Sequence, residues 1–283
     1  MIPEFFHYDF IRFALIASLL SSITAGIIGS YVVTRRMVFI TGGITHASFG
    51  GLGLGFFLGI NPLFGAAVFG VAAGIGVEYL SRFRKIREDS VIAMMWSFGM
   101  ALGIIFISLT PGYAPNLMSY LFGNILSVSM ADIWMMSILL VLVLFLFVPF
   151  FRLIQYLTFD EEFARTSRVP VSLFKYLLAG LVALTAVVYI RVAGIILVLS
   201  LLTIPQNIAL LFSNNLKKIM LLSMGIGFLG SLLGLVLSYI GNIPSGASII
   251  FSLVLLYMLA SLAKGMLNRR KAHADRILQT VKH

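Results

Sequence analysis

A single histidine lies between two apolar stretches of this chain, in the sequence Thr45-His46-Ala47-Ser48. The other three histidines lie at positions 7, 273 and 283, near the two ends. An ionisable side chain within an apolar segment is a candidate functional residue, and neutral imidazole is a common ligand of transition metals. The alternative is a histidine that hydrogen-bonds a neighbouring helix, and the sequence leaves both interpretations open. One histidine alone does not make a tight metal site, because such sites use three or four ligands.

A second polar group follows a proline. Gln206 and Asn207 come directly after Pro205, within another apolar stretch. Proline removes one helical hydrogen bond, and membranes tolerate such a break where protein or a water-lined cavity surrounds it. The two amides therefore either line a pathway or bond to neighbouring helices at a packing kink. The packing interpretation is slightly favoured.

The sequence contains no recognisable catalytic set. It has no phosphate-binding loop that ends in Gly-Lys-Ser/Thr, so it offers no evident site for ATP. It has no cysteine, and no Ser/His/Asp arrangement is visible. We therefore expect neither an enzymatic activity nor a tightly bound cofactor.

The elements that must position these polar residues are membrane-spanning helices. The chain is 60% hydrophobic and 11% charged, whereas soluble domains are about 45–50% apolar and about 25% charged. About 20 apolar residues cross the roughly 30 Å hydrocarbon core as a helix. The sequence predicts an all-α, polytopic transmembrane helical bundle, a single domain over residues 1–283 with about nine spans, or eight as the alternative. The predicted spans are 10–33, 37–59, 62–79, 91–109, 133–151, 176–190, 192–212, 219–240 and 247–262.

Basic residues predict the orientation of these spans. With the N-terminus outside and the C-terminus in the cytoplasm, the inward stretches hold 18 of the 20 lysines and arginines. The positive-inside rule expects this asymmetry. The net charge of +10 is therefore a sign of topology and not of nucleic-acid binding. The basic cytoplasmic tail at about 268–283 could also contact anionic membrane lipid.

Glycines recur at a spacing of four residues in several predicted spans. Such spacing lets helices approach closely in lipid, so we expect these glycines to pack helices together rather than to line a pore. The glycines are Gly51, Gly55 and Gly59, Gly70 and Gly74, Gly99 and Gly103, and Gly230 and Gly234.

The long inward stretch predicts a short helix around residues 159–165. Acidic residues fall in its first turn and an arginine lies near its end, as the helix dipole favours. Phe159 and Phe163 are four residues apart and would share one face. We expect a docking site for a partner protein, with a helix lying on the membrane interface as the alternative. The docking candidates are Phe159, Asp160, Glu161, Glu162, Phe163 and Arg165.

Six motifs give nearly the whole chain a resemblance to the permease subunits of the ABC-3 family, which import divalent metals such as zinc, manganese or iron. Each motif is weak by itself, and the resemblance rests on their order and on their predicted sides of the membrane. The motifs are Arg35-Arg36-Met37 with Thr45-His46-Ala47-Ser48 and Gly59-Ile60-Asn61-Pro62; Glu88-Asp89-Ser90; Tyr120-Leu121-Phe122-Gly123-Asn124-Ile125-Leu126; Phe159 to Arg165 with Val169-Pro170; Val192 to Val198 with Ile204-Pro205; and Pro244-Ser245-Gly246.

The resemblance implies an assembly in the cell membrane. Two permeases would pair as a homodimer, two cytoplasmic ABC ATPase subunits would dock on the inner loops, and an extracytoplasmic metal-binding protein would deliver the ion. The segment from Phe159 to Arg165 would belong to the ATPase-docking surface. ATP would bias the pair between inward-open and outward-open states.

The chain departs from the family pattern at two places. In one of them, Gln206 and Asn207 stand where family members usually carry small residues after Ile-Pro. In the other, family members usually carry an aspartate four residues before the histidine, where this chain has Gly42. We therefore expect His46 to meet the transported metal with weaker or different partners, for which Thr45, Ser48, Gln206 and Asn207 are the candidates. Weak coordination suits conduction, because the ion must also leave.

Two other functions compete with import of a free divalent metal. One is an ABC permease for another small solute or a chelated metal. The other is a secondary transporter that uses no ATP. The positions of the carboxylates disfavour proton coupling, because all ten aspartates and glutamates lie in loops or near segment ends.

Overall fold

The computed structural model describes residues 9–83, 87–111, 123, 125–159, 161–166 and 170–280. Helices and short turns account for these residues, and no strand occurs among them, which confirms the predicted all-α class. The helices are α2 (Asp9–Thr34), α3 (Val38–Leu58), α4 (Pro62–Phe83), α5 (Glu88–Leu109), η1 (Ile125–Ser127), α7 (Met130–Phe147), α8 (Phe151–Phe159), α9 (Glu161–Thr166), α10 (Val171–Leu201), α11 (Ile204–Phe212), α12 (Leu216–Gly241) and α13 (Ser245–Thr280).

Six helical stretches among the described residues are long and apolar enough to cross a membrane. They are Phe10–Thr34, Asp89–Leu109, Met130–Phe147, Val171–Phe212, Leu216–Gly241 and Ser245–Arg269. The chain is therefore a membrane protein with several candidate spans, whereas the count of nine and the orientation of the ends stay predictions. Helix α4 contributes a shorter apolar stretch over Pro62–Val77.

The stretch Val171–Phe212 has 42 residues, which would make a straight helix of about 63 Å, twice the hydrocarbon thickness. It is not straight, because Gly194 in α10 has φ 74° and ψ 162°. Gly123, with φ 68°, lies against the backbone of Ala193 and Gly194. The predicted boundary between two spans at Arg191 therefore lies three residues from a break in the backbone, and the helix continues past the arginine.

Local sequence signals fix several helix ends. Ser129 precedes α7, where its hydroxyl accepts from the backbone N–H of Asp132 while the Asp132 carboxylate accepts from the Ser129 backbone N–H. This reciprocal pair is a capping box. Gly59 ends α3 in the left-handed conformation, with φ 67°, and Pro62 begins α4 at a position where a missing N–H costs nothing.

Glycine brings α3 against α4 and α5. A Cβ at Gly53 would lie 2.5 Å from the Gly103 carbonyl oxygen, and one at Gly50 would lie 2.9 Å from that of Gly99. On the α4 side of α3, a Cβ at Gly55 would lie 2.6 Å from the Cα of Pro62. The predicted packing role of these glycines is confirmed. Gly59 is the exception, because nothing lies within 4 Å of its would-be Cβ and it ends the helix instead.

Side chains of a different kind fill the largest apolar cluster, which joins α2, α7, α10 and α12. Its fully buried members include Tyr31, Met136, Leu178 and Leu197. Tyr31 of α2 meets Phe147 of α7 edge to face, with ring centroids 6.5 Å apart. This cluster anchors the helices that surround the α10 break.

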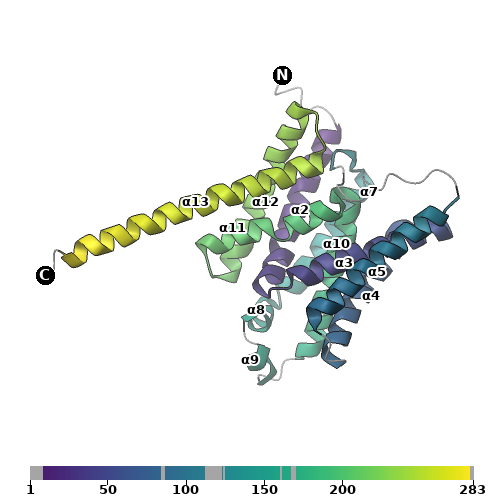
Figure 1. Cartoon of the computed structure of the whole chain (residues 1–283), viewed down its shortest axis with the longest axis horizontal. Helices are drawn as coiled ribbons and strands as arrows, with labels where there is room; N and C mark the ends of the chain where they lie inside the picture. The colour runs from purple at the N-terminus through teal and green to yellow at the C-terminus, as the bar shows by residue number, and fades with distance from the viewer. Residues whose placement is uncertain are drawn as a thin grey trace.

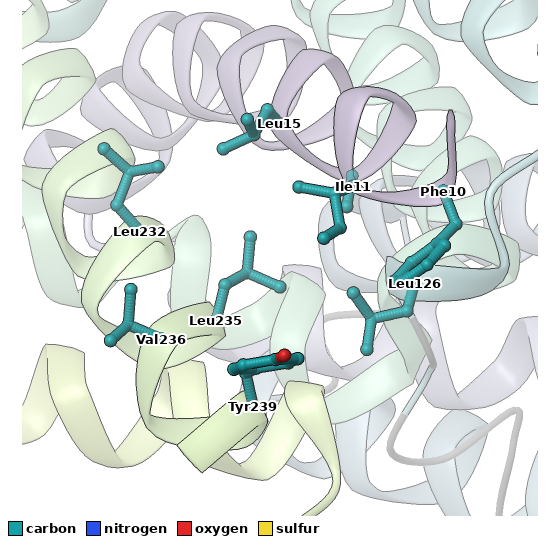
Figure 2. A pocket seen from close by; sticks show the side chains of 9 residues that line it. Phe10, Ile11, Leu15, Leu126, Leu232, Leu235, Val236 and Tyr239 are labelled. Carbon is teal, nitrogen blue, oxygen red and sulfur yellow. The ribbon is translucent and has the colours of Figure 1, made fainter. Parts of the chain in front are cut away.

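Helix α13 begins beside α12 and then projects from the body of the molecule (Figure 1). A small apolar cavity of about 110 Å³ lies between α2, η1 and α12, with Phe10, Leu126 and Tyr239 among its lining residues (Figure 2). Figure 2 shows apolar side chains around this space and one hydroxyl, that of Tyr239. The lining gives a metal ion no set of ligands.

Candidate functional site

His46 lies on α3, on the side that packs against α5. The His46 imidazole stacks on the indole of Trp96 from α5, with ring centroids 4.0 Å apart and an interplanar angle of 12°. Both side chains are partly buried, and the His46 Nδ1 atom is buried without a hydrogen-bond partner. The alternative of a histidine that hydrogen-bonds a neighbouring helix finds no support at Nδ1, because the described contact of the ring is the stack on Trp96.

Gly42 lies one turn before His46, and Trp96 and Leu199 lie beside the space that its side chain would occupy. A Cβ at Gly42 would lie 3.4 Å from Cζ3 of Trp96 and 3.9 Å from Cδ1 of Leu199. A methyl group fits at that distance, and it would be in contact with the indole and the leucine. The aromatic ring thus borders both His46 and the empty position four residues earlier.

Thr45 and Ser48 do not join His46. Both side chains are fully buried, and each hydroxyl donates to a carbonyl of its own helix, Thr45 to Thr41 at 2.6 Å and Ser48 to Ile44 at 2.8 Å. Ser48 also packs against Gly70 of α4. Both hydroxyls therefore donate within α3, which leaves their predicted part in metal binding without support from the geometry.

Gln206 ties helices together. Its side chain is fully buried, and its amide Nε2 donates to the carbonyl of Ala25 in α2 at 2.7 Å and to that of Leu201 at 3.1 Å. Gly29 of α2 leaves the room that this side chain occupies. These contacts match the packing interpretation of the amides.

Asn207 points to a different surface. Its side chain is exposed, donates to the carbonyl of Thr203 in the preceding turn at 2.8 Å, and borders a shallow pocket with Val254 and Tyr257 of α13. The two neighbouring amides therefore serve different surroundings, one inside the bundle and one on its surface.

The described residues contain no cluster of three or more His, Asp or Glu side chains that could hold a metal. An ion at His46 would thus take its remaining ligands from water, including its own hydration shell, or from another chain. Such a site suits passage and not storage, because few protein bonds must break when the ion leaves.

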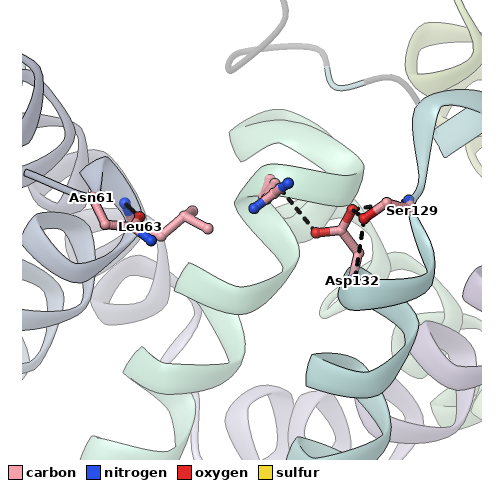
Figure 3. Close-up of polar contacts among 5 residues, drawn as sticks. Asn61, Leu63, Ser129 and Asp132 are labelled. Atoms are coloured by element: carbon pink, nitrogen blue, oxygen red, sulfur yellow. Dashed lines mark hydrogen bonds and ion pairs between the residues drawn. The ribbon is translucent and has the colours of Figure 1, made fainter.

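A buried carboxylate stands near the α10 break. Asp132 is 5% exposed and pairs with Arg191 of α10, whose Nε lies 2.9 Å from its Oδ1 (Figure 3). Its other oxygen accepts from the hydroxyl of Ser129 at 2.6 Å. Figure 3 shows the Asn61–Leu63 turn on the neighbouring side of α10. The pair joins α7 to α10 beside Gly194, a role that the sequence did not reveal because its partners are 59 positions apart.

The predicted docking segment forms two helices and not one. Phe159 ends α8 and Phe163 lies in α9. The prediction that the two rings share one face of a single helix is therefore wrong. Both are about half exposed, at 53% and 50%. Asp160 lies outside the described residues, as do the side chains of Glu161 and Arg165, whereas Glu162 is exposed.

Other contacts hold this segment in place. Tyr156 of α8 meets Phe163 edge to face, with centroids 5.3 Å apart, and Ala164 is fully buried. The Arg35 guanidinium donates to the Leu157 carbonyl and so attaches α8 to the turn between α2 and α3. The result is an anchored pair of short helices with an exposed aromatic surface, to which Tyr156 belongs although the sequence analysis did not select it.

Comparison with known proteins identifies the class. The model of the ABC 3 transport family matches residues 7–264, and the chain belongs to this family. It is 39% identical over 253 residues to an uncharacterized membrane protein of Synechocystis, covering 89% of this chain and 90% of that protein.

Named relatives are similar in extent. A manganese transport system membrane protein of Listeria innocua is 34% identical over 255 residues, covering 90% of this chain and 91% of the relative. Among solved structures, PsaBC from Streptococcus pneumoniae in complex with Fab is similar, with a TM-score of 0.82, 33% identity, and coverage of 92% of this chain and 95% of that one.

Proposed function

We propose that this chain is the transmembrane permease subunit of an ATP-driven ABC importer in the cell membrane, with a divalent transition metal as cargo. The family match over residues 7–264 carries the proposal. The names of its relatives favour manganese over zinc or iron. The chain lacks a phosphate-binding loop, so a separate ATPase subunit would hydrolyse ATP.

His46 is the proposed contact for the ion. It belongs to a helix enclosed by α4, α5 and α10, and its Nδ1 atom has no hydrogen-bond partner. A cation on this path would meet imidazole and would need further ligands, which a paired copy of the same chain would supply by symmetry. An extracytoplasmic metal-binding protein would deliver the ion.

The test is cellular metal content. The chain would be expressed with its ATPase and binding protein in manganese-starved cells, and metals measured by mass spectrometry. We expect manganese to rise, His46→Ala to reduce the rise to background, and Asn207→Ala to leave it intact. No rise for any divalent metal, with the complex assembled in the membrane, would overturn the proposed cargo.

The exposed aromatic surface of α8 and α9 is the proposed docking site for the ATPase. Phe163→Asp places a carboxylate in this surface, and we expect it to abolish copurification of the ATPase. Asn214→Asp is a matched control, because it adds the same charge at an exposed position in the turn before α12. Equal copurification by both variants would place the docking site elsewhere.

A further inference from the structure

Trp96 is the one aromatic residue that borders both His46 and the empty position at Gly42 among the described contacts. It lies on the face of α5 that meets α3, because Gly99 and Gly103 follow it by three and seven residues and pack on Ala47 and Phe49. The glycine contacts hold the two helix backbones at a fixed distance. This close approach of the two backbones brings the indole within stacking distance of the imidazole.

We propose that Trp96 is the positioning residue of His46 and, together with Gly42, limits the number of protein ligands at this site. The indole covers one face of the imidazole and holds the ring plane. Its Cζ3 edge lies 3.4 Å from the would-be Cβ of position 42 and so narrows the space for a longer side chain there. The inference rests on the proposed function, because it takes the cargo to be a divalent cation that reaches His46.

The physical consequence is a weak site to which each chain contributes few ligands. A stacked imidazole keeps its in-plane nitrogen lone pair available, because stacking uses the ring face and coordination uses the ring edge. A carboxylate at position 42 would compete with the indole for space, because Cζ3 of Trp96 lies 3.4 Å from the would-be Cβ. The ion is therefore held by imidazole without an added negative charge, which lowers its affinity and speeds its release.

Manganese binding can be measured without transport. The chain would be purified with its ATPase in lipid nanodiscs, and the signal of free Mn²⁺ followed by electron paramagnetic resonance. We expect Trp96→Phe, which keeps a flat ring over His46, to bind like the parent chain. Trp96→Leu loses the stack, whose worth predicts a dissociation constant about two- to tenfold higher.

Position 42 provides the second measurement. Gly42→Ala is expected to change nothing, because its Cβ would make an ordinary contact with the indole. Gly42→Asp should weaken binding in the parent chain and strengthen it in the Trp96→Ala background, where the carboxylate has room. Opposite effects in the two backgrounds are the sign of direct coupling.

Fluorescence gives a third readout that a purely structural role would not move. The chain has two tryptophans, and Trp134→Phe removes the other one, which is 65% exposed on α7. In this background Mn²⁺ should quench Trp96 saturably, and His46→Ala should abolish the saturable part. The parent chain and Trp134→Phe should import metal equally.

The possible outcomes separate this inference from the proposed function. If cells import manganese but Trp96→Leu binds it like Trp96→Phe, or if the effects of Gly42→Asp and Trp96→Ala simply add, the inference is wrong and the function stands. If Mn²⁺, Zn²⁺ and Fe²⁺ neither bind nor accumulate with the parent chain, the proposed cargo is wrong and the inference falls with it.

Discussion

Helices α3, α4 and α5 meet through glycine, whereas α7 and α10 meet their neighbours through large apolar side chains. In the first region the helix backbones are in direct contact, because glycine has no Cβ to hold them apart. In the second region Met136 and Leu178 fill the space between helices. The first region carries His46 and the second surrounds the break at Gly194, so the proposed metal contact and the backbone break lie in regions of different construction.

The difference matters because the hydrophobic effect, which drives helices together in water, does not act between helices in lipid. Apolar side chains gain little by leaving lipid for a protein interior, so helix association depends on close packing and on interhelical hydrogen bonds. A glycine interface allows contact along the whole backbone and tolerates no added atom. A side-chain interface can relax around a loss, because neighbouring rotamers adjust.

The largest effect is expected for Gly51→Ala. Its Cβ would lie 2.7 Å from the Cβ of Phe69 and still closer to the backbone of Gly65 in α4, so the helices must separate. We expect a loss of about 3 kcal/mol in unfolding free energy, measured by thermal unfolding in detergent. Gly180→Ala is the control, because nothing lies within 4 Å of its would-be Cβ in α10. If the two variants were equally stable, close glycine packing would not explain how α3 and α4 are held together.

A smaller loss is expected for Leu178→Ala in the side-chain region. Leu178 is fully buried, whereas its neighbour Leu177 is 46% exposed. We expect Leu178→Ala to cost about 2 kcal/mol, at the low end for core leucines because the water-transfer part is missing in lipid. Leu177→Ala should cost almost nothing in the same assay. A greater loss for Leu178→Ala than for Gly51→Ala would reverse the ranking.

Gln206→Leu sharpens the comparison by replacing a polar side chain with an apolar one of similar size. The two hydrogen bonds from Gln206 to Ala25 and Leu201 would be lost. Interhelical hydrogen bonds in membranes contribute about 0.6 to 1.7 kcal/mol, so we expect a loss of about 1 kcal/mol. Asn207→Leu should have no effect on stability, because that amide bonds only within its own helix. A neutral Gln206→Leu would show that apolar packing alone joins α11 to α2.

The smallest effect is expected for Asp132→Asn. The amide keeps an oxygen that can accept from Ser129 but loses the charge opposite Arg191, whose side chain is 47% exposed. Pairs with one exposed partner contribute about 0–1 kcal/mol, so we expect about 0.5 kcal/mol and a dependence on salt. Asp89→Asn, at an exposed position in the first turn of α5, serves as control. A loss above 2 kcal/mol would assign the ion pair a structural role at the α10 break.

The helical class and many helix limits were predictable from the sequence, because the length of an apolar stretch and the breaks that end it are local properties. The predicted span 37–59 agrees with α3 at Val38–Leu58. Hydropathy alone would have passed over this helix, which is absent from the six apolar stretches. Its glycines and polar residues lower the average, and they are tolerated because neighbouring helices, and not lipid, surround α3.

The site was only partly predictable. His46 was found because an ionisable residue in an apolar stretch is rare, but its grouping with Thr45, Ser48, Gln206 and Asn207 ignored the directions of their side chains. Trp96 was missed although a signal existed, since Gly99 and Gly103 mark the face of α5 on which it lies. Contacts between distant helices, such as Asp132 with Arg191, have no counterpart in local sequence.

Helix α13 carries a mechanical consequence. It has 36 residues and so extends about 54 Å, well beyond the roughly 30 Å of hydrocarbon. Its apolar window ends at Arg269, and the remaining turns stand clear of the body of the molecule (Figure 1). A rod fixed along part of its length acts as a lever, so a slight tilt of the membrane part becomes a sideways sweep at the far end. A small tilt of α13 inside the bundle would therefore move the tip of this helix by a larger distance.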